Sequence, residues 1–179
     1  FDAWRKHGWR APAKSGPKSA TWIDPSDLKG GVDIPDAGAE LDLPAGEQAA
    51  LRQWKTFVND DLAGYADDRN RPALSATSRM SAHLKFGTIH PRTMVADLGR
   101  GKGAQAYLRE LAFRDFYAAV VNEWPDSVWW NWNKNFNSME VNEDADAKKA
   151  FEAWKAGRTG YPIVDAGMRQ LAETGWMHN

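Results

Sequence analysis

One stretch of the chain carries an unusual set of side chains at helical spacing. Tyr107, Glu110, Phe113, Arg114 and Tyr117 recur three or four residues apart, so a helix here would place them on one face. Such a mixture suits a partly enclosed cavity that receives a flat, polar, anionic ligand. The alternative is a core helix with a single Glu110–Arg114 ion pair, an arrangement that stabilises a helix by about 0.2–0.5 kcal/mol.

A second stretch, residues 77–81, reads Thr-Ser-Arg-Met-Ser. Hydroxyl groups and free backbone N–H groups at the start of a helix form an anion site, because the amides point outward and the helix dipole favours negative charge. Arg79 would add a cation to such a site. The alternative is that Thr77 and its neighbours are ordinary helix caps, for which Ser and Thr are preferred.

Both stretches fall in a part of the chain that is helical by pattern. Apolar residues follow three- and four-residue spacing between Ala49 and Tyr65. Further helices, bounded by Gly or Pro, are expected over residues 77–87, 91–98, 105–123, 145–156 and 163–173. No segment alternates apolar and polar residues as a strand would. The sequence therefore predicts an all-α fold from residue 46 onward.

Residues 1–45 differ from the rest in composition. Pro and Gly recur between residues 12 and 44 with little periodicity, which predicts an extended linker. A possible helix before it would end at Gly8. A linker at this place implies a further segment upstream.

The overall composition limits the classes of function. The chain has 179 residues, no cysteine and a formal net charge of −1, which does not by itself indicate a nucleic-acid-binding protein. Disulfides and cysteine-ligated zinc are excluded, and the four histidines lack metal-ligand spacing, so no metal is expected. Without a long apolar run or a signal peptide, a soluble, cytoplasmic protein with no membrane contact is expected.

Several motifs, in order and at matching spacing, resemble the DNA photolyase/cryptochrome family. They are residues 77–81 followed by Pro91-Arg92, the stretch from Tyr107 to Tyr117, Phe151-x-x-Trp154, and Trp-Met-His-Asn at residues 176–179. The resemblance implies the helical FAD-binding domain over residues 46–179, truncated before an arginine and an Asp-Gly-Asp segment. It also implies that residues 1–45 are the interdomain linker and the tail of an antenna domain, which carries a folate or deazaflavin chromophore.

The resemblance also assigns roles to individual residues. FAD would be bound by Tyr65, Thr77, Ser78, Arg79, Met80, Ser81 and Tyr107. Damaged DNA would be bound by Arg69, Glu110, Phe113, Arg114, Tyr117, Trp176 and Asn179, with Glu110 and Asn179 as catalytic residues. Phe113 stands where many dimer photolyases have tryptophan, so weaker stacking on the lesion is expected. For Arg69, the residues alone favour a solvated charge in an Asp/Arg-rich turn.

A tryptophan cluster follows the aromatic stretch. Trp124, Trp129, Trp130 and Trp132 surround Pro125, and the residues alone favour packing around a helix corner. The resemblance offers a redox relay to the flavin, but the surface-terminal position of that relay falls near Val141.

The function implied by the resemblance is light-dependent repair of cyclobutane pyrimidine dimers by a monomeric deoxyribodipyrimidine photo-lyase. Reduced FAD would donate an electron to a dimer flipped out of the duplex. Two alternatives stay open: a cryptochrome-like blue-light photoreceptor that binds FAD without repair, and a helical interaction domain without flavin. The chain alone is expected to bind FAD weakly and to lack activity, because half the cavity would be missing.

Overall fold

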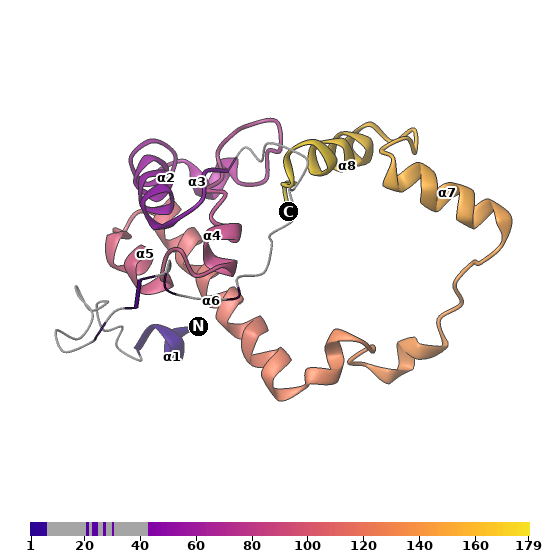
Figure 1. Cartoon of the computed structure of the whole chain (residues 1–179), viewed down its shortest axis with the longest axis horizontal. Coiled ribbons are helices and arrows are strands. Elements are labelled where there is room, and N and C mark those ends of the chain that lie inside the picture. The colour runs from indigo at the N-terminus through magenta and orange to yellow at the C-terminus, as the bar shows by residue number, and fades with distance from the viewer. Residues whose placement is uncertain (7–20, 22, 25–26, 28–29, 31–42) are drawn as a thin grey trace.

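A computed structural model describes residues 1–6 and 43–179, with isolated positions between them. All regular structure in these residues is helical (Figure 1), which confirms the all-α prediction. The helices are α1 (Asp2–Lys6), α2 (Glu47–Asp60), α3 (Tyr65–Asp68), α4 (Ser81–Lys85), α5 (Pro91–Asp97), α6 (Lys102–Glu123), α7 (Ala145–Lys155) and α8 (Pro162–Thr174), with 3₁₀ turns η2 (Pro125–Val128) and η3 (Lys134–Ser138). Most of the expected linker over residues 1–45 lies outside the described residues. No described helix is long and apolar enough to cross a membrane.

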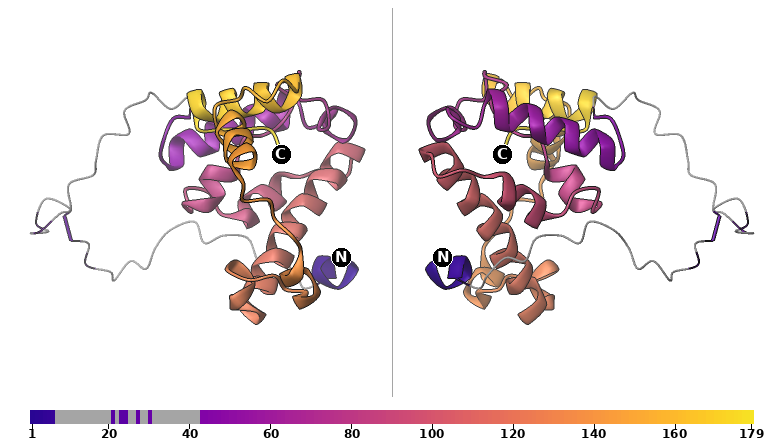
Figure 2. Two further views of the ribbon diagram at one scale, coloured as in Figure 1. Left: turned by 90° about the vertical axis from the view of Figure 1, so that its right-hand side faces the viewer. Right: turned by 90° about the vertical axis from the view of Figure 1, so that its left-hand side faces the viewer.

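A body of helices α2 to α5 packs around the first half of α6 (Figures 1 and 2). Four aromatic rings form the centre of its core. Tyr107 of α6 lies 5.2 Å from each of Trp54, Phe57 and Tyr65, measured between ring centroids. Tilted and edge-on pairs of this kind contribute about 0.5–1.5 kcal/mol each beyond the burial of their area. The ring of Tyr107 therefore joins α6 to both α2 and α3.

The start of α6 approaches the α2–α3 connection closely enough to require glycine. A Cβ atom added to Gly103 would lie 1.7 Å from the carbonyl oxygen of Leu62. Contact at that distance is impossible without moving one of the two segments. Gly103 thus sets the depth at which α6 enters the body, and Tyr107 follows one turn later.

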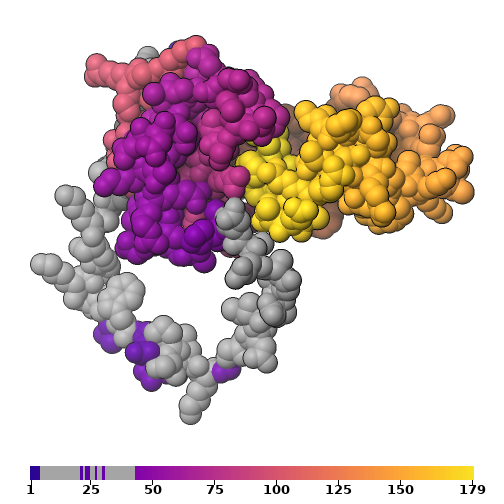
Figure 3. Space-filling view, turned by 90° about the horizontal axis from the view of Figure 1, so that it is seen from above, coloured from indigo at the N-terminus to yellow at the C-terminus, as the bar shows by residue number. Residues whose placement is uncertain are grey.

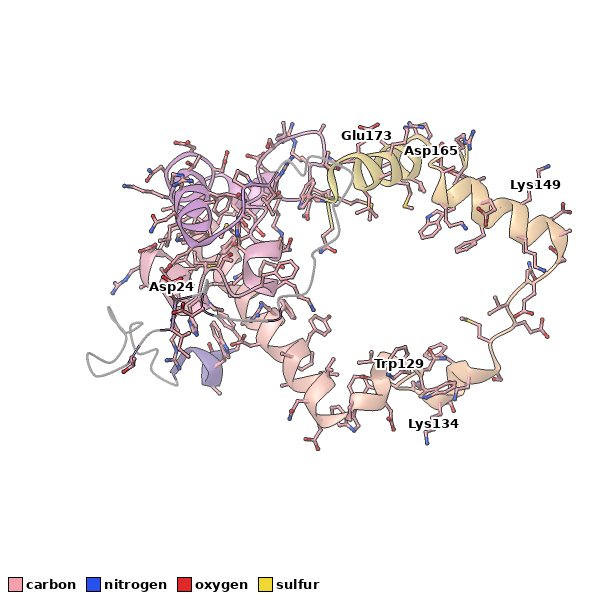
Figure 4. All side chains as sticks on the ribbon, in the orientation of Figure 1. Asp24, Trp129, Lys134, Lys149, Asp165 and Glu173 are labelled. Carbon is pink, nitrogen blue, oxygen red and sulfur yellow. The ribbon has the colours of Figure 1, made fainter. Side chains whose placement is uncertain are left out.

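Beyond Leu111, α6 leaves the core and the chain forms an arm of η2, η3, α7 and α8 (Figure 1). The space-filling view shows the C-terminal end of this arm in contact with the body (Figure 3). The tryptophans expected to pack at a helix corner are instead exposed, with Trp129 at 81% and Trp130 at 72%. Trp124 and Trp132 do contact each other, with ring centroids 4.8 Å apart. Trp129 lies on the arm, far from the body (Figure 4). The expectation of a packed corner is therefore wrong, because no other described element of this chain covers it.

A buried carboxylate holds the turn between α7 and α8 (Figure 4). Asp165 accepts hydrogen bonds from the Thr159 hydroxyl (2.6 Å), the Thr159 N–H (2.7 Å) and the Gly160 N–H (3.0 Å). The bond from the Thr159 hydroxyl is the main reason that the pKa of Asp165 is lowered from its ordinary value. After α8, Gly175 adopts a left-handed φ of 69° and turns the last residues toward the body.

Gly103→Ala tests the close approach of α6. We expect the free energy of unfolding to fall by about 1–3 kcal/mol, because the added methyl group displaces α6 from the core. Gly99→Ala is the matched control, since an added Cβ there meets no atom within 4 Å. Urea unfolding followed by circular dichroism measures both. Equal stability of the two variants would contradict the packing described here.

Asp165→Asn tests the α7–α8 turn. We expect faster amide hydrogen exchange at Thr159 and Gly160 near neutral pH, because the charged acceptor is lost. A lowered pKa means that the carboxylate stabilises the fold above the ordinary aspartate range and that this effect is lost as the pH falls through the lowered pKa. The difference between wild type and variant should therefore shrink in acid. Glu173→Gln, an exposed substitution on α8, should leave exchange at the turn unchanged.

Candidate functional site

A cavity of about 300 Å³ opens where α3, the loop before α4, α6 and the last residues meet. Most of the residues predicted to bind cofactor or substrate line it. These are Tyr65, Arg69, Thr77, Ser78, Arg79, Met80, Ser81, Tyr107, Glu110, Arg114, Trp176 and Asn179. Among the described residues, no group of histidine and carboxylate side chains could hold a metal ion. The two predicted motifs, far apart in the sequence, therefore share one hollow.

The loop of residues 77–80 precedes α4 instead of forming its first turn. The helix expected over residues 77–87 begins at Ser81, and its N-cap residue Met80 makes no side-chain cap hydrogen bond. The capping alternative is therefore wrong for α4. Because α4 has only five residues, its dipole is also too short to explain an anion site.

The backbone of this loop offers a different anion site. Arg79 has a left-handed φ of 51°, and Met80 follows with right-handed angles of −81° and 0°. A left-handed residue before a right-handed one turns successive N–H groups toward a common centre, as in anion-binding nests. A non-glycine residue in this conformation costs of order 1–3 kcal/mol, and such strain clusters at ligand sites. Gln53 supports the loop by donating to the carbonyl of Ser78 at 2.8 Å.

Two tyrosines form the inner wall of the cavity. The hydroxyl groups of Tyr107 and Ser78 share a hydrogen bond of 2.8 Å, which fixes the loop against α6. Burial raises the pKa of Tyr107 far above its ordinary value. Burial also raises the pKa of Tyr65, and the nearby Glu110 carboxylate adds to that effect. Both phenols therefore stay neutral at physiological pH and add no negative charge to the cavity.

The carboxylate of Glu110 pairs with Arg69, which follows the end of α3. The bond to Glu110 is the main cause of the raised pKa of Arg69. Arg114 instead pairs with its neighbour Asp115 at 3.5 Å. The intrahelical Glu110–Arg114 pair is thus replaced by a pair between two elements. Nor is Arg69 a fully solvated charge, because its side chain retains only 32% exposure.

The last four residues close one side of the cavity. His178 Nε2 lies 2.9 Å from the carbonyl oxygen of Arg69, and the Arg79 guanidinium lies 4.4 Å from the centroid of the Trp176 ring. The contact between the Arg79 cation and the Trp176 ring is favourable because the face of the ring carries negative potential. No role was predicted for His178. Its position beside the predicted Trp176 and Asn179 was the available signal.

Phe113 and Tyr117 do not line the cavity, so the single face predicted for them is divided. Their rings stack at 6.5 Å, and Phe113 borders a separate apolar hollow with Phe1 and Trp4. Each three-residue step along a helix falls about 60° short of a full turn. The steps from Tyr107 to Glu110 to Phe113 therefore carry the phenylalanine around to the side that faces α1.

Comparisons with known proteins show which family this chain resembles in sequence. Residues 107–179 match the family described as the FAD binding domain of DNA photolyase. A deoxyribodipyrimidine photo-lyase of Streptomyces griseus is 42% identical over 83% of this chain and 35% of its own length. A deoxyribodipyrimidine photo-lyase of Halobacterium salinarum is 35% identical over 98% of this chain and 40% of its own.

Solved structures show the same similarity. A class III photolyase from Agrobacterium tumefaciens superimposes with a TM-score of 0.71 at 36% identity, over 75% of this chain and 28% of that one. A cryptochrome from Synechocystis superimposes with a TM-score of 0.68 at 30% identity, over 80% and 31%. The chain spans about a third of the length of these relatives. With its helical fold and its sequence both matched, the chain belongs to the DNA photolyase/cryptochrome family and carries the fold of the family's FAD-binding domain.

Proposed function

We propose that this chain contributes the FAD and lesion cavity of a deoxyribodipyrimidine photo-lyase that repairs cyclobutane pyrimidine dimers in DNA with light. The names of the relatives support the proposal, and the activity is that of the whole protein. Residues 46–179 would belong to the FAD-binding domain, and residues 1–45 to the linker and the end of an antenna domain with its own chromophore. One observation carries the proposal: an anion-binding loop and a carboxylate–guanidinium pair line the same cavity.

The residues present fit a flavin dinucleotide. The backbone amide of Arg79 and the hydroxyls of Ser78 and Ser81 suit a pyrophosphate. The Met80 N–H donates to the Ser78 hydroxyl at 3.4 Å and would exchange that contact for a phosphate oxygen. Neutral phenols offer flat, partly polar surfaces for the rings. The cavity of about 300 Å³ lies at the small end of the range for ligand pockets. A dinucleotide would therefore extend across the open side of the cavity, where further protein is needed to enclose it.

Bound and reduced, FAD would supply the photoexcited electron that splits the dimer. The chain's own residues would bind and orient the lesion. The Glu110 carboxylate and the Asn179 amide would hydrogen-bond the extruded bases, and Trp176 would pack beside them. Arg114, which lines the cavity, would bind DNA at its edge, and Phe113 and Tyr117 would contact DNA outside the cavity. Extruding a damaged pair costs less unstacking energy than extruding an intact one, which favours the lesion.

A cryptochrome-like photoreceptor is the second candidate. The similarity to the Synechocystis cryptochrome and the phenylalanine at position 113 favour it. The whole protein, purified with its flavin, should be mixed with ultraviolet-irradiated oligonucleotide under blue light. Loss of dimers supports the photolyase. Bound flavin without any loss of dimers supports the photoreceptor and contradicts repair.

Ser78→Ala should weaken FAD binding by the whole protein about two- to ten-fold. The substitution removes both the hydroxyl near the proposed pyrophosphate and the bond to Tyr107, and a neutral hydrogen bond contributes about 0.5–1.5 kcal/mol. Quenching of flavin fluorescence on binding measures the affinity. Ser138→Ala, on the exposed η3 turn, is the control and should bind FAD as the wild type does. Equal affinity of both variants would place the pyrophosphate elsewhere.

Glu110→Ala should lower repair of dimer-containing DNA about ten-fold or more at unchanged flavin content. A hydrogen bond to a charged group contributes about 1.5–3 kcal/mol, and alanine offers no acceptor to the base. Dimer loss per absorbed photon and dimer affinity are the two readouts. Repair at the wild-type rate with wild-type affinity would remove Glu110 from the lesion site.

A further inference from the structure

The Arg69–Glu110 pair lies at the surface of the cavity, where it is open to exchange. The two side chains retain 32% and 38% of their exposure. Partly exposed ion pairs change an equilibrium by only about two- to five-fold, so neither partner is held firmly. Another anion can therefore replace the Glu110 carboxylate as the partner of Arg69.

The backbone of Arg69 is held more firmly than its side chain. Its N–H donates to the carbonyl of Tyr65 at 3.1 Å, and its own carbonyl lies 2.9 Å from His178 Nε2. The guanidinium lies 5.8 Å from the centroid of the Tyr65 ring. Rotation of the side chain alone can thus move the charge, while the wall of the cavity keeps its shape.

The pair occupies groups that the proposed function needs for other partners. A carboxylate bonded to Arg69 offers fewer acceptor sites to a base in the cavity. A guanidinium bonded to Glu110 is less available to a phosphate. Carboxylate and phosphate both present paired oxygens to arginine. A phosphate can therefore replace a carboxylate and keep the same two-point hydrogen bonding.

We propose that Arg69 exchanges Glu110 for a DNA backbone phosphate when DNA binds, and that this exchange frees the Glu110 carboxylate to accept a hydrogen bond from the extruded base. The proposal rests on the proposed function and adds an order of events to it: backbone binding prepares the cavity for the lesion. In the absence of DNA, the pair cancels both charges. The phosphates of FAD are a second source of the same anion, and the experiment separates the two.

Glu110→Gln in the whole, flavin-loaded protein tests the exchange on undamaged duplex DNA. With no carboxylate to leave, Arg69 should bind phosphate more readily, and the affinity should rise about two- to five-fold. Arg69→Gln should weaken the same binding and lower the slope of log affinity against log salt by about 1. Adding Glu110→Gln to Arg69→Gln should bring no gain beyond the general effect of removing one negative charge. Fluorescence anisotropy of labelled duplex measures all four proteins.

Glu143→Gln is the matched control, because it removes one negative charge from an exposed site on the arm. Any rise in its affinity for undamaged duplex reports the general effect of removing a negative charge. That rise should be smaller than the one caused by Glu110→Gln. In the same series, Glu110→Gln should reduce the preference for dimer-containing over undamaged DNA, and its FAD affinity should match the wild type.

The outcomes separate the two proposals. An equal gain from Glu110→Gln with and without Arg69, or no gain at all, overturns the exchange and leaves repair standing. Tighter FAD binding in place of tighter DNA binding also overturns it, since the flavin phosphates would then be the competitor. A wild-type protein that holds flavin but binds no dimer-containing DNA overturns the proposed function, and the exchange falls with it.

Discussion

The hydrogen bond between Tyr107 and Ser78 connects the core of this protein to its cavity. Tyr107 packs at the centre of the aromatic core, so its position is set by α2 and α3. Its hydroxyl group then holds the loop that precedes α4, and Glu110 follows one helical turn later. A single buried side chain thus fixes both the anion-binding backbone and the carboxylate. Gly103 makes this possible by letting α6 approach the α2–α3 connection.

The charges around the cavity are arranged to receive an anion. Both phenols stay neutral because burial raises their pKa, and the Glu110 carboxylate is paired with Arg69. The left-handed backbone at Arg79 adds partial positive charge without another side chain. The last residues of the chain close another side of the cavity. The arm, with its turn at Asp165, brings them back to the body, where His178 lies against Arg69. Many aromatic side chains of the arm are exposed, whereas those at the centre of the body are buried.

Local patterns predicted most of the helices, because apolar spacing and Gly or Pro boundaries are local properties. Most of the cavity residues were predicted through the resemblance of short motifs to a known family. The partner of Glu110 could not be predicted this way. Arg69 is 41 residues away, and the fold alone brings the two together. The start of α4 was misplaced because hydroxyl residues favour both caps and irregular loops. Phe113 was placed on the same face as Tyr107, although two three-residue steps turn it about 120° away from that residue. The exposed tryptophans were taken as core because tryptophan is usually buried.

In the proposed function, residues 77–81 and Glu110 surround one ligand. A crystal structure of the whole protein, purified with its flavin, tests it most directly. We expect density for the pyrophosphate within hydrogen-bonding distance of the backbone amides of residues 79–81, with Glu110 on the same cavity. A flavin bound elsewhere, or Ser78 and Glu110 on opposite sides of the molecule, would contradict the account.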